Sequence, residues 1–238
     1  MGRANAMFRV VPEWKAFFDV QEEDADGNVI TGDERRDVMI CDYKYNWDKE
    51  IYNHVKVVNK NGKDWYPGKW RREWMPIGYK NPNVTDVNFC YLRYADVVLM
   101  AAEAYNETGD TSEAWKLLNS VRKRAGAREI TTENYTELMK EKVYKLNFIS
   151  DADDAGKFRT ALYWERGFEL AFEGQRKYDL IRWGVIKEAL TLFSSRSSVK
   201  SSYPAGDNFQ KGKHELFPIP LDELQLNPMF ESKNNPNY

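Results

Sequence analysis

The densest group of residues that could do chemistry lies at 164–184, which read WERGFELAFEGQRKYDLIRWG. Glu165, Glu169 and Glu173 recur every four residues, which places three carboxylates along one side of a helix. Neighbouring carboxylates can hold a metal ion or act as the acid and base of a hydrolase. The spacing alone therefore allows a catalytic or metal site as well as a structural role.

The residues around these glutamates favour the structural role. Like charges four residues apart destabilise a helix unless cations lie opposite them. We expect Arg166, Arg176 and Arg182 to supply the cations of a semi-buried ion-pair lattice between packed helices. An apolar stripe beside the glutamates would pack against the neighbouring helices; it consists of Ala161, Trp164, Phe168, Ala171 and Phe172.

Other catalytic signatures are missing from the sequence. There is no GxSxG, HExxH, Walker or GxGxxG motif. The two histidines, His54 and His214, have no partner pattern, and Cys41 and Cys90 fit no metal-binding spacing. We expect these cysteines to be two buried free thiols in preference to a disulfide. Although a glycosidase needs only two carboxylates, we predict a protein that is not an enzyme, with no catalytic residue, cofactor or metal site.

Aromatic residues are the unusual part of the composition, at 14%, with 8 Trp and 14 Tyr. Flat rings with a polar edge suit binding surfaces, including those for sugars, which present apolar C–H faces and polar rims. Four rings lie within residues 65–74, beside Pro67-Gly68. We predict Trp65 and Tyr66 as ligand contacts and Trp47 and Trp74 as weaker candidates. Trp70 and Trp74 are four residues apart and have an alternative, structural interpretation.

Charge and hydropathy exclude several functional classes. The chain has 238 residues and a formal net charge of −2, which predicts no nucleic-acid partner. No apolar run approaches the length of a membrane-spanning helix. The first residues, MGRANAMFRVV, contain neither the apolar core of a signal peptide nor a lipobox cysteine. As written, the chain is not expected to be exported.

Turn signals divide residues 1–90, a loop- and strand-rich segment, from the helical residues 91–238, and we expect the two to form one structural domain. Val55–Val58 is the best strand candidate, and Asn61-Gly62 predicts a hairpin after it. Residues 24–28 start like a calcium loop. Val29 and Arg35 then stand where that loop needs Gly and Glu, so a hairpin turn is favoured.

Residues 92–126 have the pattern of a helical hairpin. The spacing of Ala102, Tyr105, Gly109, Ala114 and Leu118 fits a tetratricopeptide repeat. One such repeat cannot cover its own outer faces, so we expect it to pack on other helices and to leave an apolar face that this chain does not cover. Further helices are predicted over 133–147, 158–173 and 175–192, the last two hinged at Gly174.

Three stretches carry a resemblance to a known family. They are LRYADVVLMAAEAY at 92–105, the segment 164–184, and FPIPLDELQLNP at 217–228 followed by NNPNY at 234–238. Together, and in this order, they resemble the C-terminal motifs of the SusD/RagB family of surface glycan-binding lipoproteins. The chain departs from the family pattern at Gly167, Asn234 and Asn237. Asn is the residue best able to replace Gly at positive φ, so the last change is mild.

The resemblance implies a fold and a function. The fold is mainly α, with tetratricopeptide-like helical hairpins and loop-rich, short-stranded segments, and this chain corresponds to its C-terminal half. The function is non-catalytic oligosaccharide binding at the extracellular face of the outer membrane. The partner is a SusC-like TonB-dependent transporter, and membrane association runs through a lipid anchor absent from this chain.

Two alternatives from other classes stay open. One is a tetratricopeptide-type protein-interaction module without glycan binding. The other is a carbohydrate-active enzyme.

Overall fold

The structure is a computed structural model. It describes residues 9–18, 21–23, 29–51, 53–58, 64–74, 87–139, 144–196, 204–231 and 233–238. The chain divides into two compact units, Met1–Arg176 and Lys177–Tyr238. Helices dominate both, and the strands described are short and pair only two by two. The mainly helical prediction is confirmed. The division of the sequence at residue 90 stays a prediction.

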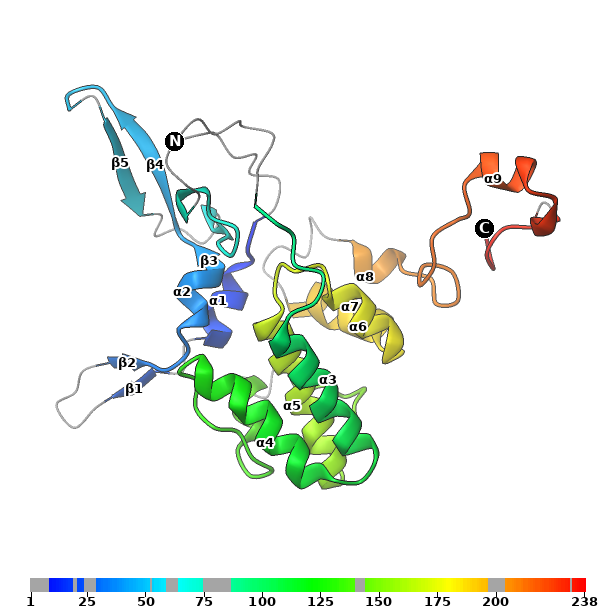
Figure 1. The fold of residues 1–238 in the computed structure, drawn as a ribbon, viewed down its shortest axis with the longest axis horizontal. Coiled ribbons are helices and arrows are strands. Elements are labelled where there is room, and N and C mark those ends of the chain that lie inside the picture. Colours follow the sequence, from blue (N-terminus) through cyan, green and yellow to red (C-terminus); the bar gives the residue numbers. More distant parts are fainter. Residues whose placement is uncertain are drawn as a thin grey trace. The chain divides into compact units, whose positions relative to one another are not determined.

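Three helices form the core of the first unit (Figure 1). They are α3 (Tyr94–Glu107), α4 (Thr111–Arg124) and α5 (Asp154–Glu169), and each contacts the other two. The predicted helical hairpin is therefore confirmed as α3 and α4. Ala102 and Ala114 are completely buried, because small side chains allow the helix backbones to approach closely. The other core side chains without exposed surface include Leu99, Leu118, Phe158 and Ala161.

Local signals set the ends of these helices. Gly109 has a φ of 95° at the turn between α3 and α4, a conformation that glycine adopts without strain. Asp110 then caps α4 by accepting a hydrogen bond from the Glu113 amide at 3.1 Å. Asp153 caps α5 in the same way, 2.7 Å from the amide of Gly156. A Cβ at Gly156 would lie 2.1 Å from the carbonyl oxygen of Ser150, so only glycine fits there.

The outer face of α3 is apolar and exposed. Tyr94 is 82% exposed, and Val97, Met100 and Tyr105 are each exposed by 41% to 43%. These residues recur at intervals of three to five, so they lie on the side of the helix away from the buried Val98, Leu99 and Ala102. The described residues thus leave uncovered the second apolar face that the repeat pattern predicts.

The N-terminal part of this unit consists of short elements. The strands are β1 (Gln21–Glu23), β2 (Val29–Thr31), β3 (Ile40–Cys41), β4 (Tyr43–Asp48), β5 (Asn53–Val58) and β6 (Tyr66–Pro67). The helices are α1 (Pro12–Phe18), α2 (Arg35–Met39) and the 3₁₀ turn η2 (Arg72–Trp74). β1 pairs with β2, β3 with β6 and β4 with β5, all antiparallel.

The two turn predictions here have different outcomes. The strand at Val55–Val58 is confirmed as part of β5, but its partner β4 precedes it. The predicted Asn61-Gly62 turn lies outside the described residues. Residues 24–28 also lie outside them, while the pairing of β1 with β2 on either side confirms a hairpin.

Two of the later helices differ from prediction. Instead of a helix over 133–147, the structure has a 3₁₀ turn, η3 (Tyr135–Met139), and residues 140–143 lie outside the described part. The helix expected over 175–192 is divided into α6 (Arg176–Arg182) and α7 (Ile186–Arg196). Gly184, with a φ of 69°, separates them, because a left-handed residue ends a helix. Gly174 is also left-handed, as the predicted hinge requires.

The second unit contains α7, α8 (Ala205–Asn208), α9 (Leu221–Leu226) and the 3₁₀ turn η5 (Pro228–Phe230). Its last residues are held by their own side chains. Asn234 accepts from the Ile219 amide at 2.7 Å, and Asn237 donates to the Gly212 carbonyl at 3.0 Å. Asn237 has a φ of 67°, which confirms that asparagine occupies a position suited to glycine.

Candidate functional site

β4 and β5 form a hairpin (Figure 1), and β4 carries an aromatic row. Successive side chains of a strand point to opposite faces, so Tyr43, Tyr45 and Trp47 share one face of β4. The register places Lys56 of β5 opposite Tyr45. The rings of Tyr43 and Tyr45 meet edge to face, with centroids 5.8 Å apart. The alternation of YKYNW in the sequence thus produces a surface of rings.

A carboxylate joins the two tyrosines. Glu73, in η2, accepts hydrogen bonds from the hydroxyls of Tyr43 and Tyr45, the latter at 2.9 Å. Burial opposes the ionisation of Glu73, but these hydrogen bonds and the charge of Arg71 outweigh it and lower its pKa. Burial and the hydrogen bond to Glu73 raise the pKa of Tyr43. The separate hydrogen bond of Tyr45 to Glu73, together with burial, raises the pKa of Tyr45. Glu73 is therefore an ionised acceptor between two protonated phenols.

Two cations lie over the aromatic rings. The Arg71 guanidinium carbon is 5.3 Å from the Tyr43 ring centroid and 5.2 Å from that of Trp74. The Lys56 ammonium lies 3.7 Å from the Tyr43 ring. These are cation–π distances. Tyr43 is thus engaged within the protein, whereas Trp47 and Trp74 are 53% and 55% exposed.

Arg71 also ties this cluster to the framework. Its Nη2 donates to the carbonyl of Ile40 at 3.0 Å and to that of Asp37, and its Nη1 lies 3.2 Å from the Tyr43 hydroxyl. We call the group of Tyr43, Tyr45, Trp47, Lys56, Arg71, Glu73 and Trp74 the hairpin cluster. It combines exposed rings with charged groups that can hydrogen-bond to hydroxyls.

Of the four ligand contacts predicted from sequence, Trp47 and Trp74 belong to the hairpin cluster. Trp65 and Tyr66 are half-buried. Tyr66 pairs with Cys41 between β6 and β3, and the Trp65 carbonyl accepts from the Val10 amide at 2.8 Å. The Lys15 ammonium lies 4.5 Å from the Trp65 ring. Both residues serve the framework, and their contact with a ligand stays a prediction.

Sequence reasoning missed Tyr43, Tyr45, Arg71 and Glu73. The signal for the tyrosines was available, because three aromatic residues at alternate positions are typical of a strand face. No local signal marks Arg71 and Glu73. They join the cluster because a chain segment about thirty residues away from β4 returns to it.

The glutamates of α5 form a buried ion-pair lattice. Glu165 is completely buried and accepts from Arg35 at 2.5 Å and from Arg122 at 2.6 Å. Glu169 accepts from Arg93 and Arg124, each at 2.6 Å, and from Arg35 at 3.1 Å. Glu173, just beyond the helix, accepts from Arg93 at 2.7 Å and from Lys69. The structural interpretation of the three glutamates is supported by these contacts.

The three cations predicted from the sequence have partners outside this set of glutamates. Arg166 pairs with Asp96 at 2.8 Å, and Arg182 with Asp179 at 3.0 Å. Arg176 donates to the Tyr163 carbonyl and lies over its ring, 3.9 Å from the centroid. The cations that meet the glutamates include residues distant in sequence, such as Arg35 and Lys69.

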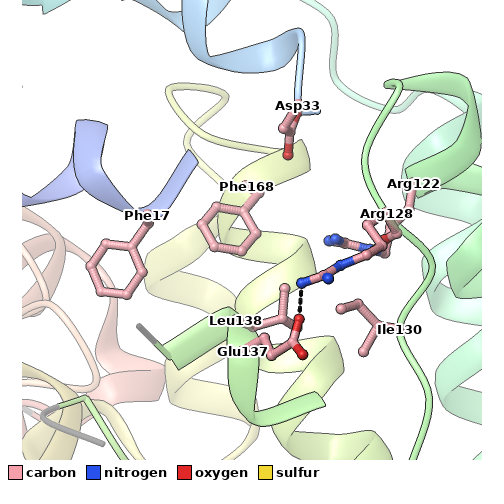
Figure 2. A pocket seen from close by; sticks show the side chains of 8 residues that line it. All are labelled: Phe17, Asp33, Arg122, Arg128, Ile130, Glu137, Leu138 and Phe168. Carbon is pink, nitrogen blue, oxygen red and sulfur yellow. Dashed lines mark hydrogen bonds and ion pairs between the residues drawn. The ribbon is translucent and has the colours of Figure 1, made fainter. Parts of the chain in front are cut away.

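A small pocket opens beside this lattice (Figure 2). Arg128 and Glu137 form an ion pair at its rim, and the rings of Phe17 and Phe168 lie across from them. Its volume of about 20 Å³ holds little more than one water molecule. This pocket is therefore too small for a sugar ring.

Within the described residues, no three or more His, Cys, Asp or Glu side chains are grouped to hold a metal ion. No helix in that part of the chain combines the length and apolar character needed to cross a bilayer. Cys41 and Cys90 are free thiols, each partly exposed.

The family model of the SusD family matches residues 9–238. The chain belongs to the SusD family. Among curated SusD-family relatives, it is 37% identical over 142 residues to SusD-like protein P25 of Formosa agariphila, covering 60% of this chain and 23% of that protein. It is 32% identical over 214 residues to SusD-like protein P2 of the same organism, covering 81% of this chain and 38% of that protein.

Solved structures of the SusD family have the same fold. A SusD homolog from Bacteroides thetaiotaomicron VPI-5482 has a TM-score of 0.66 and 30% identity, over 87% of this chain and 41% of that one. A SusD superfamily protein from Bacteroides vulgatus ATCC 8482 has a TM-score of 0.60 and 20% identity, over 96% and 44%. The SusD-like fold prediction is confirmed. This chain spans less than half the length of these relatives.

Proposed function

We propose that this chain binds an oligosaccharide at the bacterial cell surface without hydrolysing it. The observation that carries the proposal is the hairpin cluster, in a chain of the SusD family. Trp47 and Trp74 each expose more than half of their surface. Exposed ring faces stack on the apolar faces of sugars, and the polar groups beside them can bond to hydroxyls.

The electrostatics of the cluster favour binding over hydrolysis. A glycosidase needs a carboxyl group that stays protonated to act as general acid. The pKa of Glu73 is lowered by Tyr43, Tyr45 and Arg71 instead of raised. An ionised Glu73 is an acceptor for sugar hydroxyls and a poor proton donor.

The wider role is proposed from the family. The whole protein would pass its ligand to a SusC-like TonB-dependent transporter at the extracellular face of the outer membrane, where a lipid anchor would hold it. Nucleic acid is no part of this proposal, which agrees with the net charge of −2. Trp65 and Tyr66 are retained as proposed secondary contacts, because they adjoin the segment that carries Trp74.

Calorimetry against a panel of glycans tests the proposal, with Trp47→Ala, Trp74→Ala and the double variant. Each ring should contribute about 1–3 kcal/mol of affinity, by analogy with base stacking. Tyr105→Ala removes a ring that is 43% exposed on α3 and serves as the control. Unchanged affinity in the double variant would remove these residues from the site. Reducing ends that accumulate with the wild type would favour the enzyme alternative.

The outer face of α3 supports a second candidate function. Its exposed Tyr94, Val97, Met100 and Tyr105 suit a helical protein partner. A tetratricopeptide-type interaction module would show no affinity for any glycan of the panel. Binding of a helical protein partner would then depend on Val97 and Met100.

A further inference from the structure

The segment that carries Arg71, Glu73 and Trp74 starts at two anchored side chains. The Lys69 ammonium donates to the carbonyl of Glu169 at 2.9 Å, to that of Ala171 at 3.4 Å, and to the Glu173 carboxylate. The Trp70 indole nitrogen donates to the Phe172 carbonyl at 3.2 Å. Two consecutive residues of the segment are therefore fixed to the turn at 170–173.

The backbone of this turn has an unusual conformation. Phe172 has a φ of 65°, in the left-handed region that favours glycine. A non-glycine residue stays there only where its surroundings hold it. The carbonyls of Ala171 and Phe172, on either side of this left-handed Cα, are the ones that accept from Lys69 and Trp70.

The ion-pair lattice holds the same turn from its other side. Arg93 donates to the carbonyl of Glu169 at 2.6 Å and to the Glu173 carboxylate at 2.7 Å. The Lys69 side chain is 17% exposed and that of Glu173 is 5% exposed. The pair of Lys69 and Glu173 thus connects the buried lattice to the segment that carries the hairpin cluster.

We propose that Lys69 is a positioning residue for the hairpin cluster, with Trp70 as its second anchor. This inference rests on the proposed function. Beyond these anchors, the segment forms the three-residue turn η2, in which the Trp74 amide bonds to the Arg71 carbonyl at 3.2 Å. Arg71 and Glu73 hold this turn to β3 and β4, and Lys69 and Trp70 fix the chain that enters it. Affinity for a ligand depends on contact groups that are already fixed before binding.

Lys69→Met removes the cation and keeps most of the side-chain length, and Trp70→Phe is the milder variant if Lys69→Met fails to fold. The first measurement is hydrogen exchange at the amides of residues 71–74. Without its anchor, this segment should exchange about 3- to 10-fold faster. The second measurement is glycan affinity, which should weaken by about 3- to 10-fold. Lys69→Arg keeps a cation and should recover part of both effects.

Two controls separate positioning from general stability. Lys157→Met removes a lysine of α5 that pairs with Asp154 at 3.1 Å, away from the segment. Ile130→Val weakens the core at a residue that is 2% exposed. Neither should change the exchange at 71–74 or the glycan affinity.

The outcomes are distinguishable. Exchange and affinity that stay at the wild-type level in both Lys69→Met and Trp70→Phe would overturn the inference. A wild-type chain that binds no glycan would overturn the proposed function, while the exchange measurement would still decide whether Lys69 positions the segment.

Discussion

Arg93, the residue before α3, donates two hydrogen bonds to Glu169, the last residue of α5. Its Nη1 lies 2.6 Å from the Glu169 carboxylate, and its Nη2 lies 2.6 Å from the carbonyl oxygen of the same residue. One guanidinium therefore satisfies both the side chain and a backbone acceptor at the helix end, where carbonyls lack partners within the helix. The pair fastens the start of one core helix to the end of another.

Replacing Glu169 with glutamine should destabilise the fold. The change leaves Arg35, Arg93 and Arg124 without the charge that they share, and breaking a buried ion pair costs about 3–5 kcal/mol. Urea denaturation measures the loss. The control is Glu107→Gln, whose partner Arg159 lies on the surface with 45% of its side chain exposed, so its loss should be below about 1 kcal/mol. Equal losses in the two variants would contradict the prediction.

Acid should weaken the fold through the same lattice. Burial opposes the ionisation of Glu165, but Arg35 and Arg122 outweigh it and lower its pKa from 4.5. The pKa of Glu173 is lowered in the same way by Arg93 and Lys69. A group with a lowered folded-state pKa contributes stability above its unfolded-state pKa, and this stability is lost as the pH falls through the folded-state value.

The measurement is the urea midpoint between pH 7 and pH 3, which should fall once the pH drops below about 4.5. Glu173→Gln removes one of the two groups, so its midpoint should depend less on pH. A wild-type midpoint that stays constant over this range would count against the lattice as a source of stability.

The apolar outer face of α3 should promote self-association of this chain. Large exposed apolar patches seek partners. Met100→Lys places a charge in that face and should reduce light scattering at a given concentration, without loss of helicity by circular dichroism. Ser120→Lys adds the same charge at an exposed position of α4 and should have little effect. Equal scattering by both variants and the wild type would show that association arises elsewhere.

Gly156 should tolerate no side chain. A Cβ there would lie 2.1 Å from the Ser150 carbonyl oxygen and 3.0 Å from the capping oxygen of Asp153. Gly156→Ala forces the backbone to move and should cost about 1–3 kcal/mol. Gly167→Ala is the matched control on the same helix, because its nearest contact would be an ordinary 3.6 Å. Thermal melts of the two variants compare them, and a smaller loss for Gly156→Ala would refute the steric argument.

Local patterns predicted the helical hairpin, but they did not identify the cations that meet the glutamates of the lattice. The hairpin of α3 and α4 follows from apolar spacing, small residues and the Gly109-Asp110 turn, all within one stretch of chain. Arg35 and Glu165 are 130 residues apart, and Lys69 and Glu173 are 104 apart. No periodicity connects such positions, so the tertiary fold alone decides which cation meets which carboxylate.

The candidate site could also be predicted only in part from local sequence. Trp47 and Trp74 were only weaker candidates from the sequence, where the turn at Pro67-Gly68 favoured Trp65 and Tyr66. Tyr43 and Tyr45 occupy alternate positions, a pattern typical of one strand face. The position of Glu73 between their hydroxyls depends instead on how a distant segment returns to β4. The 3₁₀ turn at Tyr135–Met139 was mistaken for a longer helix, because apolar spacing does not distinguish one helical turn from several.

The lattice also limits how this sequence can recombine with its relatives. Three carboxylates, two on α5 and one just beyond it, draw their cations from four separate segments. These cations are Arg35, Lys69, Arg93 and, from α4, Arg122 and Arg124. A chimera that exchanges α5 and the turn after it for a relative's segment must bring carboxylates at the same three positions, or change four other segments together. Crossovers that preserve these five positions of positive charge are the ones compatible with a folded hybrid.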